Sequence, residues 1–233
     1  ENSKGDFINW LDSDDLLTRN HIQEHLLIYE DHKAINASVS VAGTFFTSIG
    51  DCEHKWSTIF SENDLIEDML TSKVSWQTAA VLWKQSELPI KPFREDLFSS
   101  QEWTFHLSQI IDGLTFFSFN LVTVYVRRHE NRIGKDVSLN KFKSSFFSRY
   151  IIFKKLSGNN RLQKTYQKAL INKMLQAVKK AIYYKYDKLL FMQISKLLSV
   201  VYKSDYKMKL LKIIFLYIPI YRITKRGETL FKL

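Results

Sequence analysis

The sequence predicts an α/β fold, a mixed sheet with flanking helices, followed by a basic α-helical C-terminal region. Strand-like and helix-like segments alternate through residues 1–140, which is typical of an α/β sheet. Only helical patterns follow in residues 141–233. This region contains 22 Lys and Arg residues and three acidic residues, whereas residues 1–140 contain 12 Lys and Arg residues and 21 acidic residues. We therefore expect two regions with different partners, because the acidic region can gather divalent cations and the basic region attracts anions.

Hydrophobic periodicity predicts the elements of the first region. Residues 7–11 form an apolar run typical of a short buried strand. Three further stretches predict strands, at residues 39–46, 76–83 and 115–127. Three stretches predict helices, at residues 18–31, 61–70 and 100–112. Ile22, Leu26 and Tyr29 share one face of the first helix. Ser61 is the expected cap of the second helix, with Asp64 at its third position.

The second region predicts helices that are broken at residues 158–160. Further helices are expected near residues 161–186 and 188–202. Residues 213–221 are almost wholly apolar but contain Pro219, and they are far shorter than the roughly 20 residues that span a bilayer. Cys52 is the only cysteine, which excludes an intramolecular disulfide and favours a reducing compartment. The chain opens without Met on a strand-like segment, so we interpret it as the C-terminal part of a longer protein.

An acidic turn, DSDD at residues 12–15, directly follows the first expected strand. Ligands of open α/β sheets bind at the carboxyl ends of strands. Three carboxylates on one turn repel one another unless a cation neutralises them, and hard oxygen ligands suit Mg²⁺ or Mn²⁺, which then bridges a diphosphate. An alternative is that Asp14 or Asp15 begins the next helix, because Asp favours helix N-caps. The position after a strand favours the metal site.

A resemblance to a known family covers this turn and the strand before it. GDFINWLDSDD, at residues 5–15, resembles the G-x-[YF]-I-x-x-L-D-[SA]-D-D segment of family 2 glycosyltransferases. The resemblance implies a GT-A fold, which is Rossmann-like, and a nucleotide-sugar donor. It also implies that Asp12 contacts the donor, that Asp14 holds the metal at this D-x-D motif, and that Asp15 supports donor binding.

A second match concerns the proton acceptor of the reaction. FREDL and QEW, within residues 93–103, resemble the family's f-x-E-x-L…[QE]-[DE]-W motif. The carboxylate before the Trp is the family's usual general base, which implies that role for Glu102, with Asp96 as reserve candidate and Trp103 stacking on an acceptor sugar. The alternative for Glu102 is structural, because residues 99–102 also match an S-x-x-E capping box.

A third match ends the last expected strand. YVRRHEN, at residues 125–131, resembles the family's Y-R-x-H-x-x-S ending. It implies that His129 lies near the diphosphate or completes the metal shell, and that Arg127 or Arg128 faces phosphate. The alternative is an ordinary surface histidine beside strand-end arginines. The other histidines are expected to be non-catalytic: His21, His25, His32, His54 and His106.

The resemblance covers residues 1–136 and implies that the family's first half, with the base-binding Asp and the first βαβ unit, precedes residue 1. The expected function is inverting, metal-dependent transfer of a sugar from a nucleotide-sugar donor to a glycan or lipid-linked acceptor. Such enzymes build cell-surface polysaccharide on the cytoplasmic face of the membrane. The alternatives are a catalytically incomplete, membrane-binding remnant of such an enzyme and a basic nucleic-acid-binding protein.

The basic region, residues 141–233, combines Lys with Leu, Ile, Phe and Tyr at helical spacing. Lysine-rich amphipathic helices lie on anionic membrane surfaces, and Tyr settles at the interface. We therefore expect peripheral membrane docking. The alternative is a solvated bundle whose apolar stripe packs on the first region. Nucleic acid is not expected as a partner, because no helix-turn-helix, zinc or RNP signature accompanies the charge.

Overall fold

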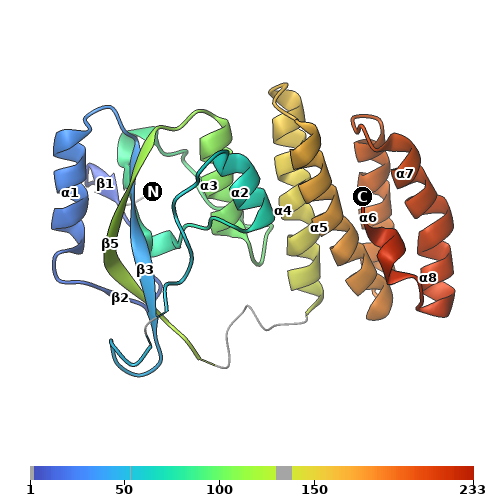
Figure 1. The fold of residues 1–233 in the computed structure, drawn as a ribbon, viewed down its shortest axis with the longest axis horizontal. Helices are drawn as coiled ribbons and strands as arrows, with labels where there is room; N and C mark the ends of the chain where they lie inside the picture. The colour runs from blue at the N-terminus through green and yellow to red at the C-terminus, as the bar shows by residue number, and fades with distance from the viewer. Residues whose placement is uncertain (1–2, 53, 130–137) are drawn as a thin grey trace. The chain divides into compact units, whose positions relative to one another are not determined.

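The computed structural model describes residues 3–52, 54–129 and 138–233, which form a mixed α/β chain (Figure 1). The chain divides into two compact units: Glu1–Arg94 with Phe105–Lys135, and Glu95–Thr104 with Asp136–Leu233. The first unit contains the sheet, whereas the second is helical. The expected α/β class and the helical C-terminal region are therefore confirmed, and the segment that carries Glu102 groups with the helices.

The sheet of the first unit has five strands in the order β1-β4-β3-β5-β2. The strands are β1 (Phe7–Ile8), β2 (Leu16–Leu17), β3 (Ala37–Phe45), β4 (Val81–Lys84) and β5 (Phe116–Arg127). β3 and β5 are parallel and lie side by side in Figure 1, while the other pairs are antiparallel. Every residue of the central strand β3 is buried, as is usual where both faces of a sheet are covered.

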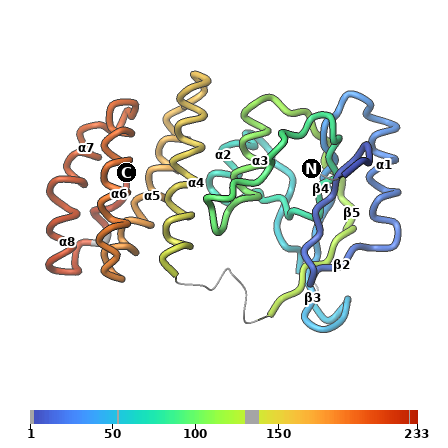
Figure 2. Tube along the Cα trace, turned by 180° about the vertical axis from the view of Figure 1, so that it is seen from behind, coloured from blue at the N-terminus to red at the C-terminus, as the bar shows by residue number. Residues whose placement is uncertain are grey.

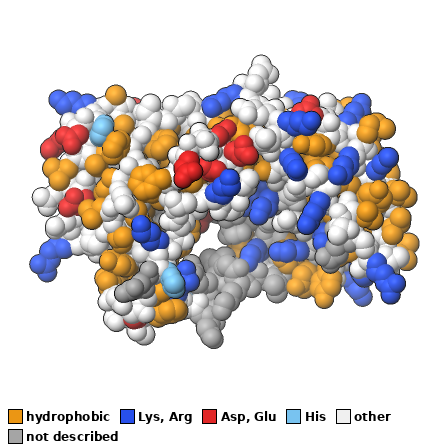
Figure 3. All heavy atoms as spheres, in the orientation of Figure 1, with side chains coloured by type: hydrophobic (Ala, Val, Ile, Leu, Met, Phe, Trp, Pro, Cys, Tyr) orange, Lys and Arg blue, Asp and Glu red, His pale blue; other side chains and the backbone are white. Residues whose placement is uncertain are grey.

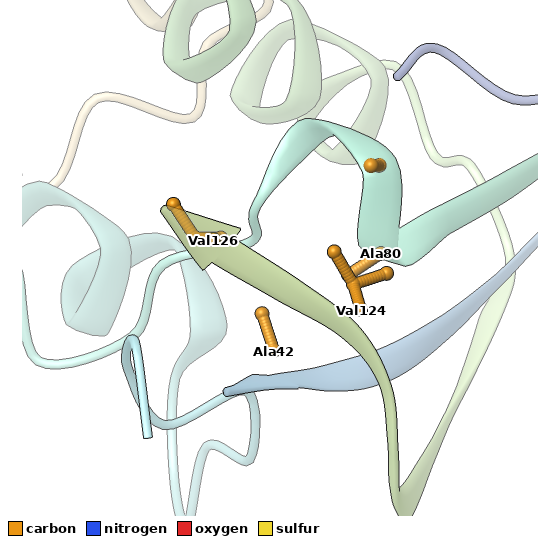
Figure 4. Packing of buried hydrophobic residues seen from close by; sticks show 5 residues of the cluster. Ala42, Ala80, Val124 and Val126 are labelled. Carbon is orange, nitrogen blue, oxygen red and sulfur yellow. The ribbon is translucent and has the colours of Figure 1, made fainter. Parts of the chain in front are cut away.

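The packing between β3, β5 and a short 3₁₀ turn, Thr78–Ala80, forms one part of the core (Figure 4). Ala42, Val124 and Val126 meet Ala79 and Ala80 of the turn. Small alanine side chains let the turn lie close against the sheet. The Gln77 side chain caps this turn by accepting hydrogen bonds from two backbone N–H groups, so the strand expected at residues 76–83 begins only at Val81.

Three helices complete the first unit: α1 (His21–Asp31), α2 (Leu65–Thr71) and α3 (Gln101–Ile111), whose first residues group with the second unit. The expected cap of α2 is wrong. Asp64 is its N-cap and accepts a hydrogen bond from the Glu67 backbone, whereas the Ser61 hydroxyl donates to the Asp68 carboxylate over 2.6 Å. The expected inner face of α1 is also wrong in part, because Ile22 is exposed.

The second unit packs successive helices of the basic region against one another (Figure 2). They are α4 (Leu139–Gly158), α5 (Lys164–Tyr183), α6 (Asp187–Val201), α7 (Lys207–Lys212), a π-helical turn η4 (Ile213–Tyr217) and α8 (Ile218–Thr224). Gln167 and Asp205 exchange two hydrogen bonds of 2.8 Å, which fix the loop after α6 on α5. Among the described residues, each helix is too short or too polar to cross a bilayer.

Candidate functional site

The acidic turn joins the first strand to β2. The backbone N–H of Asp15 donates to the carbonyl of Asp12 over 3.1 Å and closes the turn. Leu16 of β2 then pairs with Tyr125, so the turn lies beside the carboxyl end of β5. The alternative of a helix cap is wrong, because α1 begins only at His21, beyond β2.

Pairing of β2 with β5 brings Asp14 and His129 together. The Nε2 atom of His129 lies 3.2 Å from Oδ2 of Asp14, although the two residues are 115 positions apart in the chain. Their side chains are 42% and 45% exposed, so solvent and a ligand can reach both. These are the two residues that the family resemblance implies for the metal.

Asp14 and His129 form a hydrogen bond, and the two contacting atoms are also of the types that bind divalent cations. Neighbouring ligands of an octahedral ion, each about 2.1 Å from it, lie about 3.0 Å apart, close to the separation of this carboxylate oxygen and imidazole nitrogen. Within residues 3–52, 54–129 and 138–233, no cluster of three or more His, Cys, Asp and Glu could hold a metal. Mg²⁺-type ions commonly take one or two protein ligands and fill the other positions with water and phosphate.

Asp15 is buried and is engaged by the protein itself. Its carboxylate accepts hydrogen bonds from the amide Nε2 of Gln77 over 2.9 Å and from the backbone N–H of Arg127 over 3.0 Å. The carboxylate thus ties the acidic turn both to the 3₁₀ turn and to the end of β5. Asp12 and Asp14 are the exposed carboxylates of the same turn.

The two predicted phosphate-facing arginines differ in their partners. Arg127 donates from Nε to the backbone carbonyl of Asp14 over 3.1 Å, and its guanidinium lies 4.7 Å from the ring centre of Phe45. Arg127 therefore positions the turn. The Nε atom of Arg128 is buried and has no hydrogen-bond partner among the described residues. This atom is closed to a ligand, so a phosphate contact by Arg128 would have to use its terminal Nη atoms.

Glu102, Asp96 and Trp103 belong to the second unit, whereas Asp14 and His129 belong to the first. Glu102 and Asp96 are exposed. The Ser100 carbonyl accepts from the Thr104 backbone N–H over 3.1 Å, so Ser100 occupies the cap position of α3. Glu102 is then the second residue of the helix, one position short of the capping box. The capping box expected at residues 99–102 is therefore wrong, because it requires Ser99 at the cap position and Glu102 as the third residue of the helix.

Arg149 of α4 holds the start of α3 and was missed by the sequence reasoning. Its guanidinium lies 4.3 Å from the ring centre of Trp103, and Nη1 donates to the Ser100 hydroxyl over 3.1 Å and to the Ser148 hydroxyl over 2.7 Å. Burial lowers the pKa of Arg149 to about 10, which leaves the group charged at neutral pH. No local signal separates Arg149 from the other basic residues of this region.

Three of the histidines expected to be non-catalytic are buried in the first unit. The Nδ1 atoms of His21 and His25 lie 2.8 Å from the Thr123 hydroxyl and 2.6 Å from the Ser38 hydroxyl. Burial lowers the pKa of His21 to about 4 and the pKa values of His25 and His106 to about 3. All three imidazoles are therefore neutral at physiological pH.

Comparison with protein-family models and with curated proteins finds no match to this chain. Functional evidence therefore comes from the placement of the chain's own residues. The last two residues of the third predicted motif, Glu130 and Asn131, lie outside the described residues.

Proposed function

We propose that this chain carries the metal-binding and donor-binding side of an inverting, family 2-type glycosyltransferase with a GT-A fold. It moves a sugar from a nucleotide-sugar donor to a glycan or lipid-linked acceptor in cell-surface polysaccharide synthesis, on the cytoplasmic face of the membrane. The observation that supports the proposal is the 3.2 Å approach of Asp14 and His129. A carboxylate and an imidazole from distant segments meet beside an acidic turn at a strand end, where α/β folds bind ligands.

On the donor side, Asp14 and His129 hold Mn²⁺ or Mg²⁺, and Asp12 contacts the donor from the same turn. A bound divalent ion supplies stabilisation of the charge that develops on the departing nucleoside diphosphate. Arg128 faces the diphosphate through its guanidinium, next to the end of β5. Arg127 holds the backbone of Asp14 in place.

On the acceptor side, Glu102 takes the proton of the acceptor hydroxyl as that oxygen attacks the anomeric carbon. Its exposure at the first turn of α3 leaves the carboxylate open to a substrate. Trp103 packs its ring on the acceptor sugar, and the guanidinium of Arg149 holds that ring from one side. Asp96 is the reserve base.

Asp14→Ala is expected to lower the affinity for Mn²⁺ with a nucleoside diphosphate by about 100-fold or more, because it removes a direct ligand. His129→Ala is expected to act in the same direction. Isothermal titration of the full chain measures both. Asp31→Ala removes an exposed carboxylate at the end of α1 and is the matched control, expected to bind as the wild type does. Equal affinity of Asp14→Ala and wild type contradicts the metal site, and no binding by the wild type favours a non-catalytic remnant.

Glu102→Gln is expected to reduce turnover by roughly 100-fold to 10,000-fold while the affinity for Mn²⁺ and nucleoside diphosphate stays unchanged. The amide keeps the shape of the side chain but cannot accept the proton. Release of nucleoside diphosphate from a panel of nucleotide-sugars measures turnover. Glu62→Gln, a change at an exposed residue before α2, is the control. Unchanged turnover in Glu102→Gln together with a loss in Asp96→Asn moves the base to Asp96.

A further inference from the structure

The stretch from α7 through η4 to α8 is apolar on two sides. Its inner side is buried in the second unit and consists of Leu210, Ile213, Ile214, Ile218 and Tyr221. Its outer side nevertheless exposes five large apolar side chains: Met208 at 69%, Phe215 at 67%, Leu216 at 51%, Ile220 at 41% and Ile223 at 84%. A surface helix of a globular protein normally turns polar residues outward. Covering this outer side with another apolar surface would therefore be favourable, because it would remove these side chains from water.

The π-helical turn explains how both sides become apolar. The backbone N–H of Ile218 donates to the carbonyl of Ile213, five residues earlier, which widens this turn. Ile213 and Ile214 point into the unit, whereas Phe215 and Leu216 are exposed. Pro219 sits in the first turn of α8, where its missing N–H costs little. The run of apolar residues is thus divided between core and surface.

Basic side chains surround the outer side. Residues 207–226 contain no acidic residue and six basic ones, all exposed: Lys207, Lys209, Lys212, Arg222, Lys225 and Arg226. Arg222 pairs with Asp187 over 2.8 Å. In Figure 3, Lys and Arg side chains and hydrophobic side chains lie next to one another over the region of α7 and α8. Long basic side chains can keep their charge in the headgroup layer while their stems cover apolar surface.

A basic, aromatic hollow opens beside the same helix. It has a volume of about 370 Å³ and is lined by Gln176, Lys179, Lys180, Tyr183, Tyr184 and Tyr221. The side chain of Lys225, just after α8, donates to the carbonyl of Ile182 and ties this end of α8 to α5. Lysine ammonium groups and tyrosine hydroxyls both donate hydrogen bonds to phosphate oxygens.

We propose that the outer side of α7, η4 and α8 docks on an anionic lipid bilayer. Phe215, Ile220 and Ile223 enter the headgroup and acyl boundary, and the surrounding Lys and Arg contact lipid phosphates. Charge complementarity favours a lipid surface, because a positive rim around an apolar centre matches the layering of an anionic interface. The proposed docking surface would provide the membrane contact that the proposed function requires. The residues that form it all belong to the second unit.

Sedimentation of the full chain with phosphatidylcholine vesicles containing about 30 mol % phosphatidylglycerol tests the proposal. Phe215→Ser with Ile223→Ser is expected to weaken binding at least tenfold, since each removes a large apolar side chain from the interface. Lys209→Glu with Lys212→Glu is expected to weaken it by about 25-fold or more, roughly fivefold for each lost charge. The matched controls, Ile90→Ser and Lys33→Glu, change exposed residues of the first unit and are expected to pellet as the wild type does. Circular dichroism confirms that each variant is folded.

Several outcomes overturn this inference. They are equal pelleting with pure phosphatidylcholine vesicles, unchanged pelleting of both double variants, and preferential binding of duplex DNA that Lys209→Glu with Lys212→Glu removes. Concentration-dependent dimers that Phe215→Ser disperses, without vesicle binding, assign the surface to a second copy instead. Asp14→Ala is expected to keep vesicle binding, and the Phe215 and Ile223 double variant is expected to keep Mn²⁺ and diphosphate binding, so the two proposals fail separately.

Discussion

The free energy of unfolding is expected to fall by roughly 6 kcal/mol between pH 7 and pH 5, about 2 kcal/mol for each of three buried histidines. Burial lowers the pKa of His21 to about 4 and the pKa values of His25 and His106 to about 3, whereas imidazoles of the unfolded chain titrate near 6.5. Below pH 6.5 the unfolded state therefore binds more protons than the folded state. Stability is lost as pH falls from 6.5 towards the folded-state pKa values.

The surroundings of these rings offer little compensation for a proton. The ring centres of His21 and His25 lie 4.6 Å apart, so charging one opposes charging the other. His106 packs between Trp76, Trp83 and Phe105, and its Nε2 has no partner among the described residues. Three backbone N–H groups also lower the pKa of Asp51, but that contribution is lost only below about pH 4. The histidines thus dominate the window from pH 7 to pH 5.

Urea unfolding followed by circular dichroism at a series of pH values measures this effect. His106→Leu removes one titrating ring at nearly constant volume and is expected to reduce the fall between pH 7 and pH 5 by about one third. His54→Leu changes an exposed histidine and is expected to leave the fall unchanged. A pH dependence identical in wild type and His106→Leu contradicts a buried neutral imidazole at this position. Because domains are typically stable by only about 5–15 kcal/mol, cooperative unfolding near pH 5 is expected.

Secondary-structure elements could be predicted from the sequence where a local residue pattern determines them. The prediction was wrong where contacts with residues far away in the chain determine where an element ends. Valine alternation located β5, which the structure places at Phe116–Arg127. The strand expected at residues 7–11 shortens to Phe7–Ile8, because the side-chain amide of Asn9 bonds the carbonyls of Ala79 and Val81 instead of continuing the ladder. The residues near Asn9 in the sequence do not reveal these hydrogen bonds, because Ala79 and Val81 lie about 70 positions away in the chain.

The inner face of α1 shows the same limit for side chains. Its buried residues are His21, His25 and Tyr29, which follow one another at intervals of four positions, whereas Ile22 faces solvent. Hydrophobicity alone favoured Ile22. The histidines can be buried because Thr123 and Ser38, on strands β5 and β3, provide hydroxyl partners for them. The four-residue spacing of His21, His25 and Tyr29 is the only local indication that these residues share the buried face. The hydroxyl groups that make burial of the histidines possible lie on other elements.

The family resemblance singles out Asp14 and His129 as metal ligands, which stays a prediction. Their proximity depends on the pairing of β2 with β5, which the sequence does not reveal. The same pairing separates the roles of adjacent carboxylates on the acidic turn. Asp15 lies inside, bonded to Gln77 and Arg127, and Asp14 lies outside, beside His129. Composition cannot distinguish them, because both are aspartates on one turn. Their burial depends on which way the turn faces.

Asp15→Ala is expected to lower the free energy of unfolding by about 3–5 kcal/mol. The change leaves the Gln77 amide and the Arg127 backbone N–H without their acceptor, at about 1–3 kcal/mol for each buried donor. It also releases Gln77, whose Oε1 caps the turn Thr78–Ala80 against β3 and β5. Chemical unfolding at pH 7 measures the loss. Asp12→Ala, an exposed change on the same turn, is the control and is expected to stay within about 0.5 kcal/mol of wild type.

Asp14→Ala is therefore expected to lose Mn²⁺ affinity, whereas Asp15→Ala is expected to lose stability. Asp14 is about half exposed and so is its partner His129, so the Asp14 variant should keep wild-type stability while Mn²⁺ affinity falls. The Asp15 variant should lose stability first, and its folded fraction should still bind Mn²⁺ with an affinity closer to wild type. A stable Asp15→Ala that no longer binds Mn²⁺ would instead make Asp15 a ligand. In that case the turn would have to open, because the donors from Gln77 and Arg127 would need to leave the carboxylate before a metal could reach it.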